Sequence, residues 1–235
     1  MTIVVSPGAE ARADALTARA ERARDWLAEG LDTPFSFDLY VLDEDEWAAH
    51  AEVPVYAIPH ADPDSGKIVL GSQPATLFDS VFAQFWPDLE EDSRDAIHRV
   101  YGNPPMFEAF ADLILVHELM HLVPRVQPLP EMWHEELFAN LGAVGYLASE
   151  EPDELPVYMT YCRAGCDVPP SRVAYSAVVD MPSSFEDGGF ANYVWYQCRL
   201  IVAAERLWES QGVKALRALQ AGEIEVAAEV ERNWS

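Results

Sequence analysis

The chain has 235 residues, of which 50% are hydrophobic, 11% aromatic and 23% charged. This composition excludes a disordered or low-complexity polymer and predicts one large domain or two small lobes that share a core. Fifteen basic residues stand against forty acidic ones, which gives a formal net charge of −25. Such a surface repels phosphate backbones and anionic lipids, so neither a nucleic acid nor a membrane is an expected partner.

The cysteines and the N-terminus point to the compartment. Cys162, Cys166 and Cys198 are too few, and odd in number, for a disulfide framework, which favours a reducing environment. The first residues lack the basic start and apolar run of a signal peptide, and no apolar run approaches the ~18 residues of a membrane span. These features predict a cytoplasmic protein; the sequence carries no signal for its oligomeric state.

The N-terminal third predicts both helices and strands. Residues 8–29 form an amphipathic pattern that Gly30 should end. Residues 35–42 are rich enough in aromatic and β-branched side chains for a strand. The acidic run 43–46 suits the positive N-terminal end of a short helix.

Two apolar runs, 53–58 and 67–71, flank a segment of Asp, Pro, Ser and Gly and therefore predict a β-hairpin. Asp62 and Asp64 in that segment are better explained by a turn than by a calcium site, because the spaced ligands of an EF-hand are missing. Residues 67–71 could be an edge strand that pairs with an extended peptide, or a plain edge strand.

The middle of the chain predicts a helix over 76–101, interrupted near Pro87 and closed by Gly102. Asn103 and Pro104 then resemble a cap and a first helical position. The helix they would open runs to about Leu122 and is apolar on nearly every side, so it should be buried.

The last part of the chain is predominantly helical. A Pro-rich break precedes a helix over 131–148, residues 149–188 suggest loop with short elements, and helices follow over 192–210 and 213–221. Strands early and helices late predict an α+β fold with one helix through its core. We expect a single domain, 1–235, with an α/β lobe over about 1–122 and a helical lobe over about 123–235.

The buried helix contains the motif H-E-x-x-H, His117-Glu118-Leu119-Met120-His121. Residues i and i+4 lie one turn apart on one face, so the two imidazoles can converge on a single ion. Glu118 is rotated about 100° from His117, beside the ion, where a base for an attacking water is needed. Three ionisable side chains in a buried turn are costly unless they are paired or bind a metal.

A catalytic zinc needs a third protein ligand and an open position. Four downstream side chains could supply it: Glu131, His134, Glu135 and Glu136. Helical phase favours Glu136, because it falls close to the buried stripe of its helix, and Glu135 is rotated further away. The acidic residues that are not ligands would lie at the helix N-terminus, where negative charge is favourable.

These residues resemble the gluzincin metallopeptidases, whose pattern is H-E-x-x-H followed by a glutamate, often within W-x-x-E-G-F-A. The chain has Trp133-x-x-Glu136-x-Phe138-Ala139, and the closest likeness is to compact peptidase MA-like members. The resemblance implies a zincin-like fold, with a small mixed N-terminal sheet packed on the motif helix. Glu136-x-x-Ala139-Asn140 also resembles the zinc peptidases that cleave phage-type repressors.

The sequence departs from the gluzincin pattern in two places. Leu137 replaces the usual glycine, and fourteen residues (136 − 121 − 1) separate His121 from Glu136, fewer than in the large aminopeptidases. Because the substrate loop of those aminopeptidases also lacks a counterpart, aminopeptidase specificity is unsupported.

The motif and the resemblance together imply a Zn²⁺ cofactor held by His117, His121 and Glu136, with Glu118 as the general base. Asn140, one turn beyond Glu136, would either hydrogen-bond a ligand imidazole or serve packing. The resemblance further suggests an oxyanion donor from the C-terminal part, for which Tyr193 is preferred. The other candidates are Tyr158, Tyr161, Tyr175 and Tyr196.

The predicted function is zinc-dependent hydrolysis of peptide bonds in a peptide or protein substrate. Two alternatives stay open: a catalytically inactive zincin-fold module that binds metal or a partner, and a hydrolase of a non-peptide amide. Cys162 and Cys166 have the spacing of half a metal site, but without a second pair they are expected to be free buried thiols.

Overall fold

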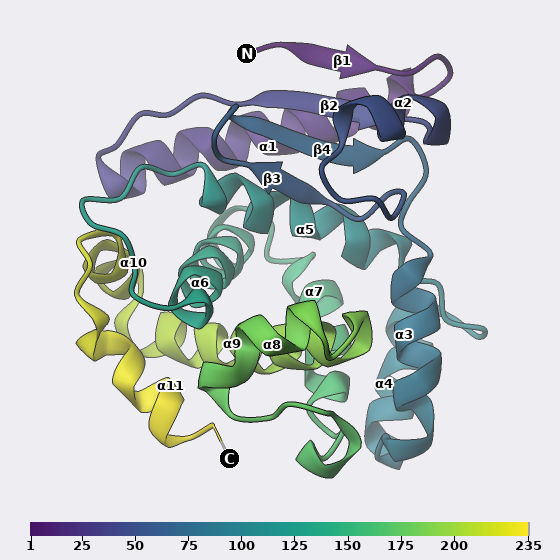
Figure 1. Ribbon diagram of the computed structural model, residues 1–235, viewed down its shortest axis with the longest axis vertical. Coiled ribbons are helices and arrows are strands. Elements are labelled where there is room, and N and C mark those ends of the chain that lie inside the picture. Colours follow the sequence, from purple (N-terminus) through teal and green to yellow (C-terminus); the bar gives the residue numbers. More distant parts are fainter. Residues whose placement is uncertain (235) are drawn as a thin grey trace. The chain divides into compact units, whose positions relative to one another are not determined.

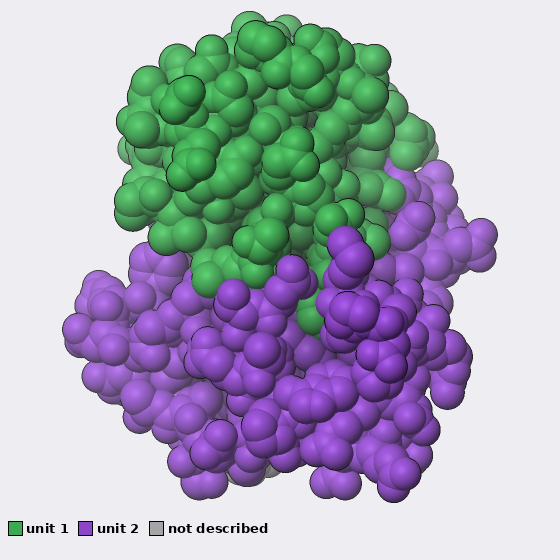
Figure 2. All heavy atoms as spheres, turned by 90° about the vertical axis from the view of Figure 1, so that its right-hand side faces the viewer, with its two compact units in different colours: residues 1–78, 107–124 green, residues 79–106, 125–235 purple. Residues whose placement is uncertain are grey.

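The computed structural model describes residues 1–234, and their fold is α+β and mostly helical, with a small mixed sheet (Figure 1). These residues form eleven α-helices and four strands. The chain divides into two compact units, which Figure 2 colours separately. Unit 1 comprises residues 1–78 and 107–124, and unit 2 comprises residues 79–106 and the chain from 125 onward.

The sheet of unit 1 has the strand order β1-β2-β4-β3. Strands β1 (Ile3–Val5), β2 (Asp38–Leu42) and β4 (Lys67–Gly71) run parallel, whereas β3 (His60–Asp62) pairs antiparallel with β4. Because β4 is paired on both sides, the expectation that residues 67–71 form an edge strand is wrong. The outer strand on that side of the sheet is β3.

The predicted hairpin is confirmed, but its first strand lies at 60–62 instead of 53–58. Pro54 deprives the earlier segment of a backbone donor, and Ala57 has a φ of 66°, so a regular ladder cannot form there. Asp62 organises the turn, since its Oδ1 accepts from the backbone N–H groups of Asp64 and Ser65 at 3.1 and 3.2 Å. The turn explanation of this aspartate is therefore confirmed.

Two helices flank β2 in the chain. Helix α1 (Glu10–Leu31) continues through Gly30, and its end is set by Asp32, which adopts a φ of 50° and donates its N–H to the carbonyls of Ala28 and Glu29. Helix α2 (Glu44–His50) begins as predicted from its acidic run, with Asp43 accepting from the N–H of Glu46 at 2.9 Å.

The motif helix, α5 (Glu108–His121), belongs to unit 1 and packs against β3, β4 and α1. It is buried along most of its length, as predicted. Its start is later than expected: Phe107 is the cap residue, because Pro104 precedes Pro105 and a residue before proline avoids the helical region. Arg12 of α1 fixes the helix by a bidentate pair with Asp112, at 2.9 and 2.6 Å.

Unit 2 is built around the long helix α9 (Phe190–Gln211), which packs against α6 (Met132–Glu150), α7 (Leu155–Gly165), α8 (Met181–Glu186) and α10 (Val213–Gln220). The remaining helices are α3 (Leu77–Phe85), whose last part lies in this unit, α4 (Glu91–Tyr101) and α11 (Ala228–Arg232).

The sequence underestimates the helical content of unit 2. Helix α7 lies within residues 149–188, whose prolines, Pro156 among them, predict loop with short elements. The proline stands in the first turn of the helix, where a missing N–H costs nothing. The predicted interruption at Pro87 is confirmed as a 3-10 turn, Trp86–Asp88, between α3 and α4.

Among residues 1–234, no helix combines the length and the apolar character that crossing a lipid bilayer requires.

Candidate metal centre

The two imidazoles of α5 converge as their spacing predicts. The Nε2 atoms of His117 and His121 lie 3.1 Å apart, and the ring planes meet at 79°. Two nitrogens bound to one tetrahedral zinc, at bond lengths of about 2.05 Å, are separated by roughly 3.3 Å. The pair is therefore spaced for a shared ion with little movement of either ring.

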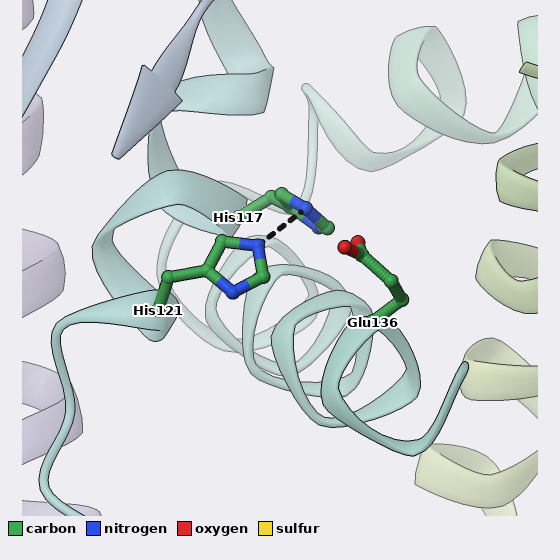
Figure 3. A group of neighbouring side chains, drawn as sticks. All are labelled: His117, His121 and Glu136. Carbon is green, nitrogen blue, oxygen red and sulfur yellow. Dashed lines mark hydrogen bonds between the residues drawn. The ribbon is translucent and has the colours of Figure 1, made fainter. Parts of the chain in front are cut away.

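The carboxylate of Glu136, on the first turns of α6, completes the group. One ligand atom from each of His117, His121 and Glu136 lies within 4.8 Å of the other two, and Figure 3 shows the carboxylate and the rings turned toward one another. This span is wider than the roughly 3.3 Å between atoms that share a zinc. Binding would thus draw the carboxylate closer, which its rotatable side chain permits.

The chemistry of this donor set fits a divalent transition metal. Two imidazole nitrogens and one carboxylate oxygen are the protein ligands of many catalytic zinc sites, and three ligands leave a coordination position open. His117 and Glu136 are each only 6% exposed. Within residues 1–234, this is the group in which three or more metal-ligating side chains come close enough to hold one ion.

Glu118 lies one residue beyond His117 on α5 and is 8% exposed. Its Oε2 accepts a hydrogen bond of 2.9 Å from the backbone N–H of Ala61 on β3. The outer strand of the sheet therefore orients the carboxylate that the sequence assigns as the base.

A hydrogen-bond network supports Glu136 from within unit 2. Gln197 on α9 donates through Nε2 to Oε2 of Glu136 and to Oη of Tyr193, both at 2.7 Å. Asn140 donates through Nδ2 to Oε1 of Gln197 at 2.9 Å. Gln197 is not predicted from the sequence: it lies four residues after Tyr193 on one helix, but no local spacing relates it to Glu136 on another.

Two of the other candidate ligands, Glu135 and His134, lie outside this group. Glu135 pairs with Arg125 at 2.7 Å and accepts from the N–H of Leu129, which ties down the preceding loop. Burial raises the pKa of Glu135, and the Arg125 guanidinium opposes that shift. His134 stacks on Trp133 with 3.7 Å between ring centroids, and burial lowers its pKa.

Two of the alternative tyrosines have evident structural roles. Tyr196 donates its hydroxyl to the carbonyl of Ala177 at 2.7 Å. Tyr161 is fully buried, and that burial raises its pKa far above the ordinary range. The preferred tyrosine, Tyr193, shares a hydrogen-bond partner, Gln197, with Glu136.

The cysteines are free thiols, as expected. Cys162 and Cys198 are buried, and Cys166 is half-buried. Burial raises the pKa of Cys166 to about 12, so its thiol stays protonated at neutral pH and is a poor metal ligand.

Comparisons with protein-family models, with curated proteins and with solved structures find no match to this chain.

Proposed function

We propose that the protein is a zinc metallopeptidase with a zincin-like arrangement, in which His117, His121 and Glu136 hold the metal. The observation that carries this proposal is the convergence of the H-E-x-x-H imidazoles and one distant carboxylate. The motif alone could be a coincidence of sequence. A third ligand of the right type, 15 residues beyond His121 (136 − 121), is a second and independent requirement of the same chemistry.

A zinc ion at this position would lower the pKa of its water toward ~7 and polarise the scissile carbonyl. With the metal bound, Glu118 would take the proton from the attacking water and deliver it to the leaving amine. Tyr193 would donate a hydrogen bond to the negative charge that develops on the carbonyl oxygen. The Ala61 N–H holds Glu118 in one orientation, which keeps the base aligned through both proton transfers.

The outer strand β3 favours an extended peptide as the substrate. It is the strand that contacts Glu118, and its position at the sheet edge allows a peptide to add as a further strand. Main-chain pairing would place a scissile bond beside the base without requiring a particular side chain. The role that the sequence suggested for residues 67–71 thus passes to residues 60–62.

Metal analysis and turnover test this function together. The purified protein should carry about one zinc, and His117→Ala and Glu136→Gln should lose it because each removes a ligand. Glu118→Gln should keep the zinc and cleave a proteome-derived peptide library about 10²–10⁴-fold more slowly, because only the proton transfer is lost.

Matched variants separate these effects from general damage. Glu135→Gln makes the same change one residue from Glu136, and His50→Ala removes an exposed histidine; both should keep zinc and activity. A Glu118→Gln protein that cleaves as fast as the parent would exclude Glu118 as the base. Complete absence of cleavage by the zinc-loaded parent, across pH and salt, would favour the metal-holding module instead.

A further inference from the structure

Gln197 is the central residue of the hydrogen-bond network that includes Glu136, and the proposed hydrolysis assigns it no role. Its three hydrogen bonds are short: 2.7 Å to Glu136, 2.7 Å to Tyr193 and 2.9 Å from Asn140. Three hydrogen bonds fix the orientation of this half-buried side chain more closely than packing alone requires.

The chemistry of the partners fixes the orientation of this amide. An ionised carboxylate only accepts hydrogen bonds, so the face of Gln197 toward Glu136 must be its NH₂ group. The oxygen then faces Asn140, whose Nδ2 is a donor. Reversing the amide would bring its oxygen against the carboxylate and its NH₂ group against a second NH₂ group, and both contacts are repulsive.

The same orientation determines how Tyr193 uses its hydroxyl. Because Nε2 of Gln197 donates to Oη, the tyrosine oxygen is the acceptor in that bond. The hydroxyl hydrogen must therefore point to a different acceptor. One amide thus restrains a carboxylate oxygen and directs a phenolic hydrogen at the same time.

We propose that Gln197 is the positioning residue of the metal centre: it holds the Glu136 carboxylate in its ligating orientation and sets the Tyr193 hydroxyl as a donor. This inference rests on the proposed function. Each helix contributes a pair of residues one turn apart, Glu136 with Asn140 on α6 and Tyr193 with Gln197 on α9. Outer-shell partners of this kind orient the ligand and tune its affinity for the metal.

The test measures zinc affinity by competition with a chelator, so it does not depend on turnover. Gln197→Met keeps the side-chain length but removes both donors, and we expect zinc to bind about 10–100-fold more weakly. Gln197→Glu should bind zinc more weakly still, because it places a second carboxylate against Glu136. The visible absorption of the Co²⁺-substituted protein should change in both variants, since a reoriented carboxylate alters the coordination geometry.

Two further variants make the test specific. Asn140→Asp leaves all three proposed ligands in place, yet its carboxylate would repel Oε1 of Gln197 and turn the amide over, so zinc affinity should fall as in Gln197→Met. Gln84→Met and Gln84→Glu make the same changes on the exposed face of α3 and should leave the affinity at the parent value. Circular dichroism and thermal unfolding of the metal-free proteins verify that each variant folds.

The outcomes distinguish this inference from the function on which it rests. Equal zinc affinity and an unchanged Co²⁺ spectrum in both Gln197 variants would overturn the positioning role and leave the metal centre intact. A parent protein that binds no zinc would overturn both. Affinity that depends on Gln197, without any peptide hydrolysis, would count against the peptidase and support the positioning of Glu136.

Discussion

His60, on β3, is a buried histidine with one ring nitrogen satisfied. Its Nδ1 hydrogen-bonds the Ile58 carbonyl at 3.0 Å, and its Nε2 is buried without a hydrogen-bond partner among the described residues. Burial lowers the pKa of His60, and Lys67 adds to this, while the Ile58 carbonyl, Glu52 and Asp62 oppose it. A charged imidazole would have to leave Nε2–H unsolvated, which is why the neutral form is preferred.

This lowered pKa predicts a loss of stability in mild acid. The unfolded chain takes up the proton near the ordinary histidine pKa of about 6.5, whereas folded His60 still resists it. More protons bound in the unfolded state means that the free energy of unfolding falls as the pH drops through that value. Urea unfolding of the parent and of His60→Phe from pH 7.5 to 5 should show a shallower decline in the variant.

The exposed His50 provides the control for this measurement. His50→Phe removes an exposed histidine instead of a buried one, and its free energy of unfolding should decline as that of the parent does. Parallel curves for the parent and His60→Phe would show that His60 takes up its proton equally well in both states.

Spacing along the sequence predicts which side chains a single helix brings together, and little more. His117 and His121 are related by one helical turn, so their convergence follows from the motif. Glu136 could be preferred over Glu135 because helical phase separates adjacent residues by about 100°. Gln197 could not be found in this way, because its contact with Glu136 depends on how α9 packs against α6.

Helix α9 approaches its neighbours closely where they carry glycine. A methyl group on Gly165 of α7 would lie 2.5 Å from Sγ of Cys198, and one on Gly145 of α6 would lie 2.6 Å from the Trp208 ring. These distances are too short for non-bonded atoms. The absence of a side chain at each position is therefore what allows the helices to pack.

We expect Gly165→Ala to destabilise the protein. Alanine favours a helix over glycine by about 1 kcal/mol, but overpacking a buried contact costs roughly 1–3 kcal/mol. Cys198 is 1% exposed and its short side chain has nowhere to move, so the steric cost should exceed the gain. Urea denaturation should report the net loss.

The double variant Gly165→Ala/Cys198→Ala tests the stated cause. Removing Sγ opens the space that the new methyl group needs, so the two changes together should cost less than the sum of the single changes. Additive losses would mean that the clash with Cys198 is not the source of the destabilisation.

Element types were predicted more successfully than element boundaries. Long periodic segments such as α1, α6 and α9 are recognisable because their apolar faces repeat over several turns. The three-residue strands β1 and β3 are too short for any such pattern, and only pairing with β2 and β4 defines them. Helix α7 was not predicted because its proline suggests a break, although in the first turn of a helix a proline is tolerated.

The whole molecule carries a formal charge of −25, and this charge should make its stability depend on salt. Like charges repel one another more strongly in the folded state, where they are held close together. The screening length falls from about 30 Å at 0.01 M salt to about 10 Å at 0.1 M. Thermal unfolding in increasing NaCl should therefore show a rising Tm over this range.

The dependence of Tm on NaCl should be steep at low ionic strength and should flatten once the repulsion is screened. A Tm that is constant or falls with added NaCl would mean that the carboxylates are already compensated in the folded protein.

The two compact units do not follow the order of the chain. The order of elements in the sequence suggests lobes over about 1–122 and 123–235. In the structure, residues 107–124 belong to the same unit as residues 1–78, and residues 79–106 belong with the later helices. A single sequence contains no signal for such an excursion, because each helix within it is locally ordinary.

This interruption of unit 1 has a consequence during synthesis on the ribosome. All four strands emerge before residue 72, but the helix that packs against β3 and β4 ends only at His121. The nascent sheet must wait some fifty residues (121 − 71) for this helix, and the part of β4 that the helix covers stays exposed meanwhile. Nascent chains in which the four strands, but not this helix, have left the ribosome should therefore be the ones that chaperones recognise.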